Sequence, residues 1–131
     1  MTDFEKAKEF FAADLYATEV TGIEILEARK QYARCSLVLD KRHQNAVGHV
    51  MGGVLFTLAD FVFGISANFG AASPTVTVSS NIQFLAPPRG RVIYGESKLL
   101  KDGKRSCFYE ITVTDEDGSP VAIATINGMH L

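Results

Sequence analysis

A long apolar segment that begins at paired glycines constrains the fold of this chain most. Within Gly52–Ala71, apolar side chains recur every three or four residues: Val54, Leu55, Leu58, Phe61, Val62, Ile65 and Phe69. This spacing predicts an α-helix, and because the apolar side chains reach nearly every face, the helix should be buried. Polar residues interrupt the segment (Thr57, Asp60, Ser66 and Asn68) and make it too polar to span a membrane.

Alternating apolar and polar residues on both sides of this segment predict strands. The predicted strands are Gly22–Ala28 and Gln31–Asp40, which form a hairpin, and then Thr75–Leu85, Arg91–Lys101, Lys104–Thr114 and Val121–Met129. Turn signals at Gly90, Asp102-Gly103 and Asp117-Gly118 separate the later strands. Asp3–Leu15 has apolar residues near helical spacing, so residues 1–15 are expected to hold a short N-terminal helix.

These elements predict an α+β fold in which an antiparallel sheet wraps around one long central helix. A length of 131 residues suits a single domain, residues 1–131. One helix cannot cover both faces of a long sheet, so a second subunit is expected to cover part of the remainder.

Charge and cysteine content exclude several classes of function. The net charge is −2, with 13 basic and 15 acidic residues in mixed order, whereas nucleic-acid binding requires a basic surface. The charged N-terminus does not resemble a signal peptide, so a cytoplasmic protein without a membrane association is expected. Cys35 and Cys107 belong to no metal or redox motif and are expected to be buried free thiols.

The three histidines give no sign of a metal site. His43 and His49 lack a third ligand at a sensible spacing, and both are expected to be polar groups of a loop. His130 lies next to the end of the chain and is expected to be solvated. Neither a metal nor another cofactor is predicted.

The loop before the long helix carries the chemistry. A polar segment from His43 to Met51 leads into Gly52-Gly53, and glycines leave the N–H groups of the first helical turn unshielded. With the helix dipole, these N–H groups form a site for a carbonyl oxygen that gains negative charge. Asp60 follows about two turns later and is costly to bury without a partner. Its carboxylate either activates water or attacks a carbonyl, or it bonds to a neighbouring group and stabilises a dimer.

The same stretch resembles the hotdog-fold thioesterases of the 4-hydroxybenzoyl-CoA thioesterase superfamily, in particular the phenylacetic-acid-degradation type. Asn45, Gly48, Gly52-Gly53 and Asp60 stand at the positions of that group's motif, and Val76–Pro87 is similar to its next strand. The resemblance implies a hotdog fold and hydrolysis of an acyl-CoA thioester to a carboxylic acid and free coenzyme A. It further implies a homodimer, or a dimer of dimers, with the site between subunits.

The resemblance also assigns catalytic roles. The backbone N–H of Gly52 would polarise the thioester carbonyl, and Asn45 would help to hold that carbonyl or the water. Asp60, contributed by the other subunit, would be the base or the nucleophile. Thr77 stands where related enzymes have a Ser or Thr that positions the water; Ser79 and Ser80 are the less favoured neighbours.

Substrate contacts are expected from two further groups of residues. Gly53 and Met51 flank the polarising N–H, and Met51 replaces the family's His; a methionine donates no hydrogen bond, which predicts reduced activity or an altered substrate range. Basic residues near strand ends (Arg89, Arg91, Lys101, Lys104 and Arg105) are candidates to bind the phosphates of coenzyme A. Ordinary surface charge also accounts for any one of them.

Two alternative functions compete with hydrolysis. Val50–Leu55 is similar to a motif of hotdog dehydratases, but those enzymes need a Glu where Leu58 stands, and their catalytic His has no counterpart here. The other alternative is a non-catalytic protein that binds acyl-CoA or another acyl ligand. Asp60 and Asn45 favour the enzyme, because a binding protein requires neither; the discriminating observation is whether substitution of Asp60 removes turnover.

Overall fold

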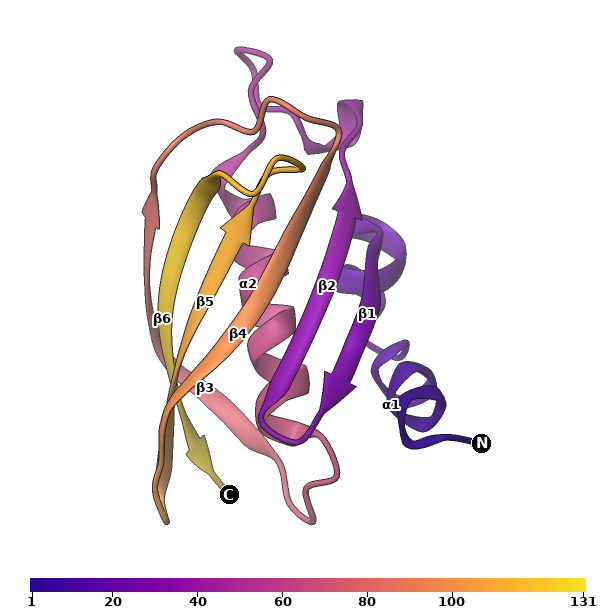
Figure 1. Ribbon diagram of the computed structural model, residues 1–131, viewed down its shortest axis with the longest axis vertical. Helices are drawn as coiled ribbons and strands as arrows, with labels where there is room; N and C mark the ends of the chain where they lie inside the picture. Colours follow the sequence, from indigo (N-terminus) through magenta and orange to yellow (C-terminus); the bar gives the residue numbers. More distant parts are fainter.

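The computed structural model describes residues 1–131 as a six-stranded antiparallel sheet that curves around one long helix (Figure 1). The strands lie in the order β1-β2-β4-β5-β6-β3. Their bounds are β1 (Ile23–Arg29), β2 (Tyr32–Val38), β3 (Thr75–Phe84), β4 (Val92–Asp102), β5 (Ser106–Thr114) and β6 (Pro120–His130). The helix is α2 (Gly52–Asn68). The predicted α+β architecture is confirmed.

The core lies between α2 and the inner face of the sheet. Leu58, Val62 and Ile65 of α2 are completely buried, as the apolar spacing predicts. On β5 every second residue from Cys107 to Val113 is buried, which is the period-2 pattern of a strand with one covered face. Cys35 and Cys107 are buried free thiols in this core, as predicted. No helix of the structure is both long and apolar enough to cross a membrane.

The N-terminal segment differs from the prediction. The helix α1 (Asp3–Phe11) is capped by Thr2, whose side chain forms a capping box with that of Glu5. It ends at Phe11 rather than Leu15, and a π-helical segment, η1 (Tyr16–Thr21), follows and ends at Gly22, which has φ of 95°. In Figure 1 this segment runs along the side of the molecule where β1 forms the edge of the sheet. Apolar spacing alone did not distinguish one continuous helix from two short helical segments.

Two histidines are held by hydrogen bonds within the chain, and for His130 the prediction was wrong. His43, in the short helix η2 (Lys41–His43), is 3% exposed; its Nδ1 accepts from the Asp40 N–H at 3.0 Å, so its Nε2 donates to the Thr21 carbonyl at 2.7 Å. His130 is half-buried instead of solvated, because β6 continues to this residue. Its ring bonds to Thr75 Oγ1 at 2.7 Å and to Asp102 Oδ1 at 2.8 Å.

Candidate active site

The N-terminus of α2 presents unpaired backbone N–H groups. Met51 is the N-cap residue, and its side chain makes no capping hydrogen bond. The N–H groups of Gly52 and Gly53 have no partner in the chain. A side chain at position 52 would meet the Phe84 ring, since a Cβ there would lie 3.0 Å from Phe84 Cζ. A larger residue at position 52 would displace the exposed Phe84 ring, and the first turn is left as a site for a partly negative oxygen.

The loop before α2 is a compact turn organised by Asn45. Asn45 Oδ1 accepts from the N–H groups of Val47 and His49, each at 3.1 Å. Gly48 donates to the Asn45 carbonyl at 3.0 Å and has φ of 82°, a conformation that favours glycine. The amide nitrogen of Asn45 makes no hydrogen bond within the chain, so it is free to donate to a ligand. Asn45 itself is exposed.

Asp60 and Thr77 form the second part of the candidate site. Thr77 Oγ1, on β3, donates to Asp60 Oδ1 at 3.1 Å. Both residues line a cavity of about 430 Å³ whose walls include Phe56, Phe61 and Phe63. A β-bulge between Thr77 and Ser79 interrupts the alternation of β3, and Ser79 bonds to Asn127 instead. Thr77 is therefore the hydroxyl of this strand that contacts Asp60.

The surroundings of Asp60 favour its protonated form more than water does. Burial of the carboxyl raises the pKa of Asp60, and the nearby carboxylate of Asp14 raises it further. The hydrogen bond from Thr77 opposes this rise, because it stabilises the charged form. A carboxylate with a raised pKa in a largely apolar cavity is a stronger base than an exposed one.

The four residues predicted to be catalytic do not all come together in one chain. Gly52 and Asp60 are eight residues apart on the same helix, which corresponds to about 12 Å along its axis. Neither Gly52 nor Asn45 lines the cavity that holds Asp60 and Thr77. The structure thus brings together Asp60 with Thr77, and leaves Gly52, Gly53 and Met51 as a separate group at the start of α2.

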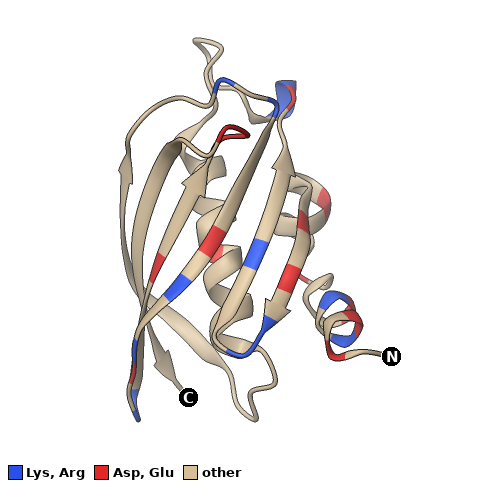
Figure 2. Cartoon of the chain, viewed as in Figure 1, with Lys and Arg blue, Asp and Glu red and all other residues tan.

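The basic residues predicted to bind phosphate are also dispersed. Arg89 pairs with Asp117 at 3.2 Å, and Arg91 lines a small cavity beside the loop that contains Gly48 and His49. Lys104 follows the far end of β4, eleven residues long, so it lies at the opposite end of the sheet from Arg91. In Figure 2 the ribbon is coloured for basic residues near both ends of β4, with acidic positions among them. Within one chain, these three residues cannot bind the same phosphate.

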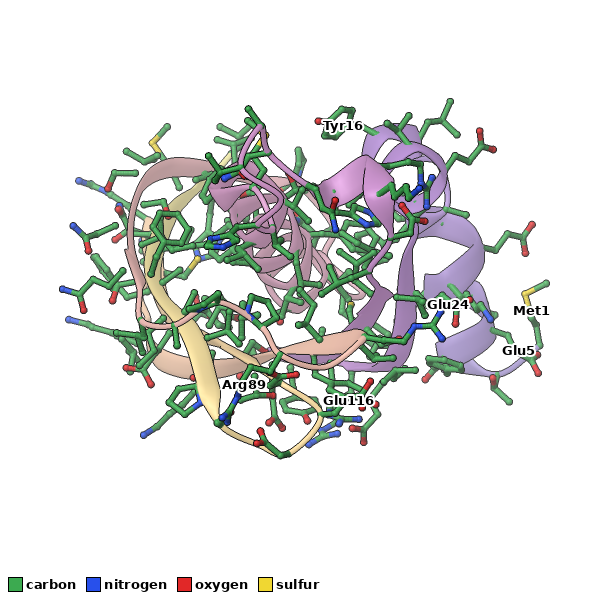
Figure 3. The ribbon with its side chains drawn as sticks, turned by 90° about the horizontal axis from the view of Figure 1, so that it is seen from above. Met1, Glu5, Tyr16, Glu24, Arg89 and Glu116 are labelled. Carbon is green, nitrogen blue, oxygen red and sulfur yellow. The ribbon has the colours of Figure 1, made fainter.

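The N-terminal segment also contributes to the cavity, which the sequence did not predict. Asp14, Leu15 and Tyr16 line it together with Asp60. In Figure 3, Tyr16 projects on the side of the molecule opposite Arg89. Leu15 and Tyr16 are 55% and 67% exposed, so no burial pattern marked them. No His, Cys, Asp or Glu side chains come together in a group of three that could hold a metal ion.

The fold and the arrangement around α2 agree with one family. The model of the thioesterase superfamily matches residues 47–122, which include the loop end, all of α2 and strands β3 to β5. The chain belongs to this superfamily. It is also 29% identical over 98 residues to acyl-coenzyme A thioesterase 13 of Homo sapiens, an alignment that covers 72% of this chain and 69% of that protein.

Solved structures share the fold at low sequence identity. The PaaI protein from the phenylacetic acid degradation operon of E. coli superposes with a TM-score of 0.85 at 20% identity, covering 98% of this chain and 96% of that one. A hypothetical thioesterase of Streptococcus pneumoniae, solved with coenzyme A, has a TM-score of 0.82 at 23% identity and covers 94% and 95%. The predicted hotdog fold is thereby confirmed, and the thioesterase-family relatives support a hydrolase that acts on thioesters.

Proposed function

We propose that this protein hydrolyses an acyl-CoA thioester to a carboxylic acid and free coenzyme A. The observation that carries the proposal is a half-buried Asp60 carboxylate, hydrogen-bonded to Thr77, on a helix whose own N-terminus offers unpaired N–H groups. The human relative is named an acyl-coenzyme A thioesterase, and the Streptococcus pneumoniae structure contains coenzyme A. Both facts favour a CoA thioester over other esters.

The proposed reaction uses these groups in sequence. The Gly52 N–H donates to the thioester carbonyl oxygen and stabilises the negative charge that develops there. Asp60 removes a proton from water, whose oxygen bonds to the carbonyl carbon, while Thr77 holds the carboxylate in position. When the tetrahedral intermediate collapses, the C–S bond breaks, the sulfur receives the proton from Asp60, and the carboxylic acid is released. In the alternative route the Asp60 carboxylate attacks the carbonyl carbon, the C–S bond breaks and the coenzyme A thiolate leaves to take up a proton from solvent, and water then hydrolyses the mixed anhydride.

A site of this kind requires two copies of the chain, because Gly52 and Asp60 of one copy are too far apart to act on one carbonyl. The free edge of β3 suits such an assembly. This ten-residue strand is paired on one side only, and its Val76, Val78 and Phe84 are 41%, 59% and 55% exposed. A long apolar edge strand is an aggregation hazard unless it is covered. We therefore propose a homodimer joined along β3. The dimer of dimers, the single-domain division and the cytoplasmic location stay predictions.

Turnover assays test hydrolysis directly. Release of free thiol from butanoyl-CoA should be readily measured for the native protein and fall at least a hundredfold in Asp60→Asn, which keeps the shape but loses the base. Thr77→Val should reduce kcat less. Circular dichroism and light scattering serve as controls for fold and assembly. Equal rates for Asp60→Asn and the native protein would refute the proposed role. Incorporation of ¹⁸O into Asp60 during a single turnover in H₂¹⁸O would select the anhydride route.

Mixing two inactive variants tests whether the site lies between subunits. Gly52→Pro removes the N–H at a position where helices tolerate proline, and Asp60→Asn removes the base. If subunits exchange freely, half of the dimers are mixed, and each mixed dimer has one intact site. We expect about a quarter of the native activity from an equal mixture. A mixture as inactive as its components would contradict a shared site.

One observation favours the non-catalytic alternative. Met51 is the N-cap residue, is 55% exposed and supplies no hydrogen-bond donor beside Gly52. A protein that binds acyl-CoA without turnover would retain tight binding of the thioester but show no thiol release. In that case Met51→His should create activity. In an active enzyme the same substitution should change kcat or KM for an existing reaction.

A further inference from the structure

A groove extends from Asp60 along one face of α2. The cavity around Asp60 adjoins a second one of about 530 Å³, and the two share Asp14, Gly64 and Thr75. A third, of about 360 Å³, shares four wall residues with the second: Phe10, Phe11, Asn68 and Ala71. Asp60, Gly64 and Asn68 are spaced four residues apart, so they lie on the same side of the helix. We call this continuous space the acyl groove.

The two sides of the acyl groove differ in origin. One is α2 itself, and the other is the N-terminal segment, which contributes Phe10, Phe11 and Leu15. Phe10 is 70% exposed and stands edge-on against Phe11, with ring centroids 5.0 Å apart. Phe11 is buried at 7% exposure and supports the Phe10 ring, which presents an apolar wall beside the helix face.

Gly64 keeps the middle of the groove open. A Cβ at this position would meet nothing within 4 Å, although the residues before and after it on α2 are buried. Glycine inside a helix is unfavourable relative to alanine, and no neighbouring atom requires it here. A larger side chain at position 64 would therefore project into the groove and narrow it.

We infer that the acyl groove binds the linear alkyl chain of the substrate and that Gly64, by leaving the groove open, admits chains that extend past its own position. This inference rests on the proposed hydrolysis at Asp60. From Asp60 to Asn68 the helix rises about 12 Å. An extended alkyl chain advances about 1.25 Å per carbon, since its C–C bonds of ~1.5 Å are staggered. The groove therefore accommodates about ten carbons, and Gly64 lies beside the fifth.

The shape of the groove favours an alkyl chain over an aromatic acyl group. It continues past Asp60 for two helical turns between Gly64 and the N-terminal segment, a length that one ring attached near the carbonyl leaves unfilled. Each additional buried methylene is worth up to about fourfold in binding. Decanoyl-CoA should consequently be the better substrate than butanoyl-CoA or phenylacetyl-CoA.

Gly64→Leu tests the inference, because leucine suits a helix and would fill the groove halfway along. For the native protein, kcat/KM should be at least tenfold higher for decanoyl-CoA than for butanoyl-CoA. In Gly64→Leu, kcat/KM for decanoyl-CoA should fall at least tenfold and that for butanoyl-CoA should change less than twofold. Gly64→Ala should lie between the two. Ala13→Leu adds the same side chain at an exposed site outside the groove and should change neither value.

Three results would overturn the inference while leaving hydrolysis intact. These are no preference of the native protein for decanoyl-CoA over butanoyl-CoA, a preference for phenylacetyl-CoA, or an equal loss for both chain lengths in a folded, dimeric Gly64→Leu variant. If no thioester is hydrolysed, the proposed function fails by itself. Calorimetric titration of decanoyl-CoA into the native protein and into Gly64→Leu then tests whether the alkyl chain binds in the groove. Tenfold weaker binding to the variant supports this inference, and equal affinity refutes it.

Discussion

Gly128 should be among the least replaceable residues of the fold. It lies buried in β6, where β3 and α2 meet. An added Cβ would lie 2.7 Å from Phe63 Cζ, 2.8 Å from the Val76 carbonyl oxygen and 3.0 Å from Thr75 Cγ2. The ring of Phe63 is itself fixed against Tyr109, with centroids 5.5 Å apart. None of these atoms is the end of a flexible surface side chain, so Gly128→Ala forces the core to shift.

The expected loss of stability follows from two opposing effects. Overpacking a core by one methyl group costs about 1–3 kcal/mol, and the top of that range applies because one of the three contacts is backbone. Replacing a strand glycine recovers roughly 0.5–1 kcal/mol. The net destabilisation should be about 2 kcal/mol. With an unfolding entropy near 2.1 cal/mol/K per residue, a chain of this length should lose about 7 °C in Tm.

Thermal and urea unfolding, followed by circular dichroism, measure this effect against a matched control. Gly64→Ala is the same substitution where no atom lies within 4 Å, and it should raise Tm by about 2–4 °C. Adding Phe63→Leu to Gly128→Ala removes the closest atom, so the double variant should be more stable than the sum of the single effects. A Gly128→Ala protein as stable as the native one, or strict additivity with Phe63→Leu, would show that the packing argument is wrong.

Three further outcomes depend on individual ionisable groups. Asp14→Asn should lower the pKa of Asp60 and move the acid limb of the kcat/KM profile to lower pH, because it removes a charge that raises this pKa; an unmoved limb would contradict the coupling. Burial raises the pKa of Cys35 to about 12, so a thiol reagent at pH 8 should label this residue only in urea, and rapid labelling of the native protein would oppose this. Asp115, which is 4% exposed, accepts three backbone N–H bonds that hold its pKa below the ordinary value. Its contribution to stability is present above about pH 4 and is lost as pH falls through the lowered pKa, so Asp115→Asn should flatten the decline of the urea midpoint in acid.

The sheet and α2 were predictable because burial on one side of an element imposes a period on its sequence. β5 alternates buried and partly exposed residues, and α2 carries apolar residues on almost every face, so both were predicted to within a few residues. The N-terminal segment was harder to predict, because Phe10, Leu15 and Tyr16 are apolar but exposed. Their spacing reflects a surface groove rather than the core, and the helix was therefore predicted to be four residues too long.

The residue types that form the site could be predicted from the sequence, but the contacts between them could not. Asp60 stood out because a carboxylate in an apolar helix needs a partner, yet the sequence did not reveal that Thr77 is that partner. The bulge after Thr77 breaks the alternation from which strand directions are inferred. Asp14 carried no signal, because its effect on Asp60 depends on the path of the chain between α1 and η1. Arg91 and Lys104 lie far apart because β4, an extended strand of eleven residues, separates them. The turn positions marked the ends of this strand but did not by themselves give the distance between the two side chains.

The position of Thr77 links assembly to catalysis in the proposed dimer. Thr77 contacts Asp60 from β3, and β3 is also the exposed edge that a second copy would cover. The strand that would join two subunits is therefore the strand that orients the base. Dissociation would separate Asp60 from the other subunit's Gly52, whereas the hydrogen bond from Thr77 to Asp60 forms within one chain. Specific activity should consequently fall on dilution of the protein, as the dimer dissociates and each site loses one of its two halves.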